Sequence, residues 1–112
     1  MSVVIESSVF YSNAAGVKGG AICAVGTEFV EVYKSEFQYN EAGINDDGNG
    51  SGGDIYASDG VTLWVQSSKF VDSYASYGGG AIECCGGTIT GSTFTGAESG
   101  SGSSVSAKLL SI

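Results

Sequence analysis

The acidic side chains are the residues of this sequence with the greatest capacity for chemistry. The chain has 112 residues, of which 12 are Asp or Glu, and Asp46, Asp47 and Asp54 lie in one Asn- and Gly-rich segment. Carboxylate and amide oxygens are the ligands that Ca²⁺ prefers. The segment lacks the alternating acids and the closing Glu of an EF-hand loop. We therefore favour a solvated loop, keep calcium as the alternative and expect no other cofactor.

Catalysis would have to rely on carboxylates alone. The sequence contains no His and no Arg, so Ser-His, Cys-His and zinc-hydrolase arrangements are excluded. A pair of carboxylates can hydrolyse a neutral glycoside. The candidate pairs are Glu36 with Asp72 and Glu31 with Glu83. The lysines are scattered along the chain and provide no site for an acidic sugar, so we expect that the protein is not an enzyme.

The net charge of −8 excludes two classes of partner. Nucleic acids and anionic membrane surfaces both require a basic face, because binding displaces cations from phosphate groups. No apolar run approaches the roughly 20 residues that cross a bilayer, so we expect no membrane insertion by this segment. Hydrophobic residues make up 42% of the chain, which is typical of a folded domain.

One modification site and three cysteines complete the reactive residues. Asn49-Gly50-Ser51 is an N-glycosylation sequon, which would be occupied only in a secreted glycoprotein. Cys23 and Cys85 are expected at outward or corner positions, and Cys84 in the interior as a small apolar residue. A bridge between Cys23 and either of the others would span two repeats, which is too far for a disulfide. A Cys84–Cys85 bridge and an intermolecular bridge stay open and are not favoured.

The elements that position these residues follow from an internal repeat. Ser-x-Phe occurs four times, and the Phe residues are 27, 33 and 24 positions apart. A β-branched aliphatic residue stands five positions before each Phe, and a pair of small residues leads to another aliphatic residue after it. The long second copy carries six extra residues, which places a loop insertion at 45–51. One domain, 1–112, therefore consists of four repeats.

Each repeat has the pattern of several short strands. Apolar residues come in pairs two positions apart, which is the period of a β-strand. One repeat cannot bury its own apolar side, so the repeats must stack about 4.8 Å apart as an all-β solenoid of about four coils. The predicted core ladder consists of Phe10, Phe37, Phe70, Phe94, Ile22, Ile55, Ile82 and Val105. A sandwich of hairpins is the alternative, but its turn dipeptides cluster in the second repeat alone.

The corners between strands give further expectations. The Gly pairs suit corners that need a positive φ or a close backbone approach, so Gly20→Val should destabilise the fold. Asn13 and Asn40, three positions after Phe, suit corners as well, because Asn tolerates the left-handed conformation and its side chain can bond the backbone of the next repeat. Trp64 and Tyr33 should point outward, where they could contact a sugar or a protein.

The repeat resembles that of the polymorphic outer membrane proteins, known from chlamydial surface adhesins. The similarity is carried by Phe-x-x-Asn at residues 10–13 and 37–40 and by Gly-Gly-Ala-Ile at 19–22 and 79–82, and it covers roughly residues 3–107. The second repeat departs from it with Gly-Gly-Asp-Ile, and the third with Ser73 in place of Asn. The resemblance implies a right-handed parallel β-helix of the pectate-lyase type, located outside the cell or at its surface.

These observations lead to a functional hypothesis. We expect a structural or adhesive module, part of a longer chain or filament, whose partners are other copies, other surface proteins or glycans. The alternative is a module that binds or degrades carbohydrate.

Overall fold

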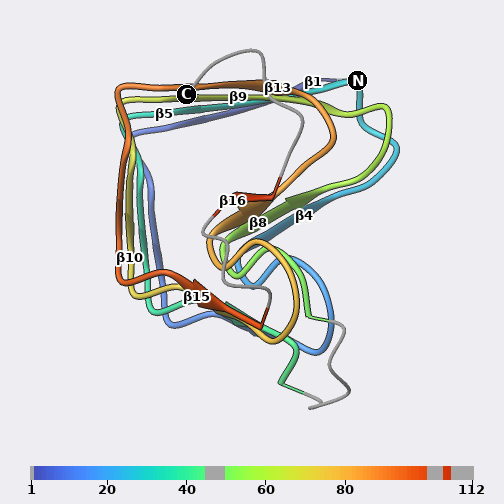
Figure 1. The fold of residues 1–112 in the computed structure, drawn as a ribbon. Coiled ribbons are helices and arrows are strands. Elements are labelled where there is room, and N and C mark those ends of the chain that lie inside the picture. Colours follow the sequence, from blue (N-terminus) through green and yellow to red (C-terminus); the bar gives the residue numbers. More distant parts are fainter. Residues whose placement is uncertain (1, 45–49, 101–104, 107–112) are drawn as a thin grey trace.

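The computed structural model describes residues 2–44, 50–100 and 105–106. These residues form short β-strands and contain no helix. The chain passes through four sheets in turn and then returns to the first sheet one strand further along, as Figure 1 shows in a view along the stack. Each repeat therefore contributes one strand to each sheet.

All the strand pairs are parallel, and every sheet has four strands. The first sheet contains β1 (Ser2–Glu6), β5 (Phe29–Tyr33), β9 (Thr62–Gln66) and β13 (Gly87–Thr90). The second sheet contains β2 (Val9–Tyr11), β6 (Glu36–Gln38), β10 (Lys69–Val71) and β14 (Thr93–Thr95). The third sheet contains β3 (Ala14–Ala15), β7 (Glu41–Ala42), β11 (Tyr74–Ala75) and β15 (Glu98–Ser99). The fourth sheet contains β4 (Ile22–Ala24), β8 (Ile55–Ala57), β12 (Ile82–Glu83) and β16 (Val105–Ser106).

The register predicted from the repeat is confirmed. Phe10, Phe37, Phe70 and Phe94 pair in sequence across the second sheet. Their rings stack in parallel with centroids 4.8, 4.8 and 4.7 Å apart. Ile22, Ile55, Ile82 and Val105 pair in the same way across the fourth sheet. Because every repeat places the same residue type at the same height, like side chains form continuous ladders in the core.

The serines of Ser-x-Phe occupy the corner before the second sheet. The Ser35 hydroxyl donates to the Tyr33 carbonyl (2.9 Å) and accepts the backbone N–H of Ser8 (3.1 Å). Ser68 and Ser92 repeat this arrangement. One hydroxyl thus completes its own turn and links it to the preceding repeat, which explains why the motif requires Ser at this position.

The left-handed residues lie one position away from those predicted. Two corners flank the second sheet, and each has a positive φ in every repeat: Ser7, Lys34, Ser67 and Gly91 before it, and Ser12, Tyr39, Asp72 and Gly96 after it. The asparagines follow these corner residues and are not left-handed themselves. The expected side-chain bond to the backbone of another repeat is present, but it runs to the preceding repeat and not to the next one. The Asn40 side chain accepts the backbone N–H of Asn13 (2.8 Å) and donates to the Phe10 carbonyl (3.1 Å).

In each Gly pair, one glycine has the positive φ and the other makes the close backbone approach. The first Gly of each pair has a positive φ, for example Gly19 at 66°. Gly20, the second, is not in that region, and φ is therefore not the reason that a side chain is excluded there. A Cβ on Gly20 would overlap the Gly53 carbonyl oxygen and lie 2.6 Å from that of Glu41.

The ladder resumes at the end of the predicted insertion. Ser51 pairs with Lys18 and Gly78, so it occupies a position that the neighbouring repeats also have. Residues 45–49 lie outside the described residues.

Candidate functional site

The outer face of the first sheet carries the side chains with the greatest binding capacity. Residues of its strands alternate between the core and this outer face. Val30, Val32, Leu63 and Val65 are buried in the core. The outward positions form three rows across the strands: Ser2, Phe29 and Thr62; Val4, Glu31, Trp64 and Thr88; and Glu6, Tyr33, Gln66 and Thr90. We call this surface the outer face.

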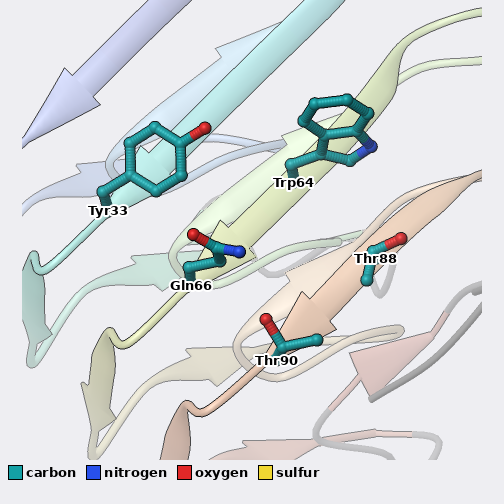
Figure 2. A pocket seen from close by; sticks show the side chains of 5 residues that line it. All are labelled: Tyr33, Trp64, Gln66, Thr88 and Thr90. Carbon is teal, nitrogen blue, oxygen red and sulfur yellow. The ribbon is translucent and has the colours of Figure 1, made fainter.

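The outer face contains a hollow of about 230 Å³ between Tyr33 and Trp64. Gln66, Thr88 and Thr90 complete its lining. Figure 2 shows all five side chains projecting from the outside of three successive strands, β5, β9 and β13. The two large aromatic residues are followed on β13 by two small threonines, and this change in size creates the depression.

Trp64 is held in place by a second aromatic residue. The rings of Trp64 and Phe29 meet edge to face with centroids 5.2 Å apart. Such contacts restrict the ring while leaving its other surface accessible. Trp64 keeps 39% of its surface exposed, so it is both ordered and available for contact.

Acidic groups lie beside the hollow but do not line it. The pKa of the Tyr33 phenol is raised, first by partial desolvation and then by the neighbouring carboxylates of Glu31 and Glu6. Part of this effect is a hydrogen bond to Glu31, so the phenol O–H is already donated to that carboxylate and the phenol oxygen is left as an acceptor. The five lining residues are themselves uncharged.

Two further hollows adjoin the first along the same face. One is lined by Glu6, Tyr33, Lys34, Gln66 and Ser67, and the other by Ser2, Phe29, Glu31 and Trp64. Tyr33 and Trp64 each line the central hollow and one of its neighbours. The three depressions thus form one continuous surface that follows the rows of side chains.

Sequence reasoning found part of this surface. Trp64 and Tyr33 were predicted to point outward, and the structure places both on the outer face. Phe29, Gln66 and Thr88 were not recognised as their neighbours. The period of two within each strand, combined with the register of the repeat, could have found them, because outward residues at equivalent positions must be adjacent.

The predicted calcium residues are separated by the fold. Asp46, Asp47 and the sequon residue Asn49 lie outside the described residues. Asp54 is fully buried rather than part of a solvated loop. Its carboxylate accepts hydrogen bonds from Asn40 Nδ2 (2.8 Å) and from the Ser73 hydroxyl. Among the described residues, no group of three or more His, Cys, Asp or Glu side chains is arranged to hold a metal ion.

The candidate carboxylate pairs occupy separate places. Glu31 lies on β5 in the first sheet and Glu83 on β12 in the fourth. Glu36 pairs in register with Val9 and Lys69, whereas Asp72 lies at the corner after β10.

The cysteines are placed as the repeat predicted. Cys84 is buried, and Cys23 and Cys85 are exposed. Burial raises the pKa of the Cys84 thiol to about 11, which keeps it protonated and unreactive. None of the three cysteines, all of which the structure describes, is in a disulfide.

In the part of the chain that the structure describes, no helix is long and apolar enough to cross a membrane. Comparison of the sequence and structure with protein-family models, with curated proteins and with solved structures finds no match.

Proposed function

We propose that the chain is a segment of a right-handed parallel β-helix that serves as a non-catalytic structural or adhesive module outside the cell or at its surface. Parallel strands in four stacked sheets support this architecture. The resemblance of the repeat to that of surface adhesins supports the location. In this role the module is extended by further repeats, provided by a second copy of the chain.

The observation that carries the proposal is the apolar edge of the first repeat, β1–β4. Val3 is 37% exposed, whereas its equivalents Val30 and Leu63 are 1% and 0% exposed. Phe10 stacks on Phe37 on one side and is partly buried, whereas Phe37 and Phe70 are fully buried. The first repeat thus presents the same ladder residues as the middle repeats, with one side that no other described residue covers.

The backbone of this edge is equally suited to extension. The strands β1, β2, β3 and β4 each stand at the end of their sheet. An edge strand presents N–H and C=O groups that another strand can pair with. Four such edges at the same end make a template for a complete additional repeat.

A second copy fits this template head to tail. The strands β13–β16 end the opposite side of the four sheets, so stacking would place Phe94 of one copy on Phe10 of the next. By the same register Ile89 would meet Ile5, and Thr90 would lie beside Glu6. No like charges meet at these positions, and each pair continues an existing ladder.

Sedimentation velocity over a range of protein concentrations tests the proposal. We expect a series of species that grows with concentration, because head-to-tail contacts do not close on themselves. Ile5→Lys should abolish association, because it places a charge on the apolar edge. Tyr74→Lys adds the same charge at an exposed position on β11, inside the stack and away from both of its ends, and should leave association intact. Circular dichroism of both variants checks that they remain folded.

Two results would contradict the assembly role. The first is a chain that stays monomeric at every concentration. The second is equal loss of association in Ile5→Lys and Tyr74→Lys, which would show that net charge alone controls association.

The location is tested by the intact mass of the protein from its native source. A mass that falls on enzymatic deglycosylation would support export, with Asn49 as the site. An unglycosylated protein recovered from the interior of the cell would contradict it.

A further inference from the structure

We propose that the outer face binds a neutral oligosaccharide, with Trp64 as the stacking platform. This site uses the outward side chains of β5, β9 and β13, whereas assembly uses the strand edges. Its lining meets the assembly contact at β13 alone, where stacking would place Thr90 beside Glu6 of a second copy. The proposal therefore goes beyond the assembly role and can fail or succeed independently of it.

The aromatic residues suit the apolar face of a sugar ring. A pyranose presents C–H groups on its faces and hydroxyl groups around its rim. Trp and Tyr have an apolar ring and one polar group, and they make large contacts at a low cost in conformational entropy. Trp64 is exposed and fixed by Phe29, and Tyr33 stands on the other side of the hollow. The ring of Trp64 is therefore already in place before a ligand arrives.

The remaining lining suits the hydroxyl rim. Gln66 supplies two N–H donors and a carbonyl acceptor, and Thr88 and Thr90 each supply a hydroxyl that donates and accepts. The Tyr33 phenol donates to Glu31, and its oxygen adds a further acceptor. A ligand with many hydroxyl groups can satisfy this set, whereas a purely apolar partner would leave it unpaired.

The electrostatics select a neutral sugar. The lining of the central hollow is uncharged, and the carboxylates of Glu31 and Glu6 stand next to Tyr33. The whole chain has a net charge of −8. The adjoining hollows add the carboxylates of Glu6 and Glu31 against one cation, Lys34, so the local and the global charge balance both disfavour an anionic glycan.

The size of the surface selects an oligomer. The central hollow, about 230 Å³, is below the roughly 300–1,000 Å³ of a pocket for a drug-sized ligand, so it suits one sugar ring. The two adjoining hollows share Tyr33 or Trp64 with it. A chain of sugar rings can therefore occupy successive hollows, and its two ends can extend beyond them along the surface of the sheet.

The single tryptophan makes the test specific. The chain contains one Trp, so its fluorescence reports on the proposed site alone. The probes are cellohexaose, maltohexaose, xylohexaose and chitohexaose, with the hexamer of galacturonic acid as the anionic comparison. We expect a saturable change in Trp emission with at least one neutral hexamer and none with the acidic hexamer. Isothermal titration calorimetry then measures the affinity of variants that lack the fluorophore.

Matched variants locate the binding surface. Trp64→Ala should weaken binding at least tenfold, and Thr88→Val should weaken it by a smaller factor, because it keeps the shape and removes one hydroxyl. Tyr74→Ala is the control, because Tyr74 is 42% exposed, close to the 39% of Trp64, but lies on β11 in the third sheet. Tyr74→Ala should bind as the unmodified chain does. Binding should also survive in Ile5→Lys, which separates this site from the assembly edge.

Three outcomes would overturn the proposal. One is the absence of binding by every neutral hexamer in calorimetry. Another is binding that is unchanged in Trp64→Ala. The third is a change in Trp64 emission that follows protein concentration and not sugar concentration, which would identify the outer face as a contact between protein molecules.

Discussion

At the scale of single residues, the two departures from the repeat motif explain each other. Asp54 stands where the first and third repeats have Ala21 and Ala81, and Ser73 stands where the earlier repeats have Asn. In the structure the Ser73 hydroxyl donates to the Asp54 carboxylate, and Asn40 donates to its other oxygen. A buried carboxylate is stable only with such partners. The cluster therefore joins the second and third repeats. Asp54 needs Ser73 as a hydrogen-bond donor, and Ser73 needs Asp54 as an acceptor.

The stability of the protein should depend on the ionisation of Asp54. Burial raises the pKa of this carboxyl from 3.8 to about 7, although the hydrogen bonds from Ser73 and Asn40 oppose the change. Between these pH values the folded chain holds a proton that the unfolded chain has released, so stability is lost as pH rises through the window. The full change corresponds to at most about 4 kcal/mol. Asp54→Asn should remove this part of the pH dependence.

Urea unfolding from about pH 4 to about pH 8 measures the effect. Glu41→Gln, at an exposed position on β7, is the control and should follow the unmodified chain. Parallel pH curves for Asp54→Asn and the unmodified chain would show that Asp54 does not titrate in this window.

Two glycines separate the effects of backbone conformation and of space. Gly26 has a φ of 76° and open space around it, whereas Gly20 lacks a positive φ and meets the backbone of the next repeat. Gly26→Ala should cost about 1–2 kcal/mol, the penalty of a left-handed Ala. Gly20→Ala should cost more, about 3 kcal/mol, the upper end of the usual range for overpacking, because strands must move apart to admit the methyl group. Thermal unfolding of both variants gives the comparison, and a smaller cost at Gly20 would contradict the close approach.

At the scale of elements, the same residue type contributes a different amount to the stability of the protein in each repeat. The strands are two to five residues long, and none has a complete hydrophobic environment of its own. Phe37 lies between Phe10 and Phe70, whereas Phe10 has a stacking partner on one side. The contribution of a ladder residue is therefore set by its neighbours above and below.

Phe37→Ala should destabilise the protein by about 3–5 kcal/mol, the range for a large buried cavity. Phe10→Ala should cost less than half as much, because its side chain is already partly exposed. Denaturant unfolding of the two variants measures the difference. The unfolding experiment is done at low protein concentration, because assembly at high concentration would cover the first repeat. Equal losses of stability in the two variants would then mean that Phe10 is buried in solution.

At the scale of the whole molecule, the net charge opposes the association of copies that the exposed strand edges favour. Each copy has a net charge of −8, so two copies repel one another. The apolar edge of β1–β4 nevertheless favours stacking. The balance between these two contributions should depend on ionic strength.

Raising NaCl from about 0.02 M to about 0.5 M should strengthen association, because the screening length falls well below the size of the molecule. Sedimentation velocity at matched protein concentrations checks this. An association that weakens with salt would indicate contacts between opposite charges instead of the apolar edge.

The repeat alone predicted the ladders of Phe and Ile, the pairing register and the outward direction of Trp64. It could do so because stacked repeats place equivalent positions directly above one another, so local spacing becomes long-range contact. It misplaced the left-handed corners by one residue, since a φ value depends on how the turn is closed and not on which residue tolerates it. The acidic composition of the second repeat made Asp54 a calcium candidate beside the inserted loop, whereas the structure buries it.

What remained for the tertiary structure to decide lies in the differences between repeats. The pairing of Asp54 with Ser73 joins residues that no periodic pattern connects. The hollow between Tyr33 and Trp64 lies among residues that the register makes neighbours, but its depth depends on side-chain sizes that differ from repeat to repeat. The sequence by itself determined where each repeat lies on the next, because that depends on residue types that recur. The tertiary structure decided what the non-recurring residues do, because their roles depend on side-chain size, direction and burial among neighbours from other repeats.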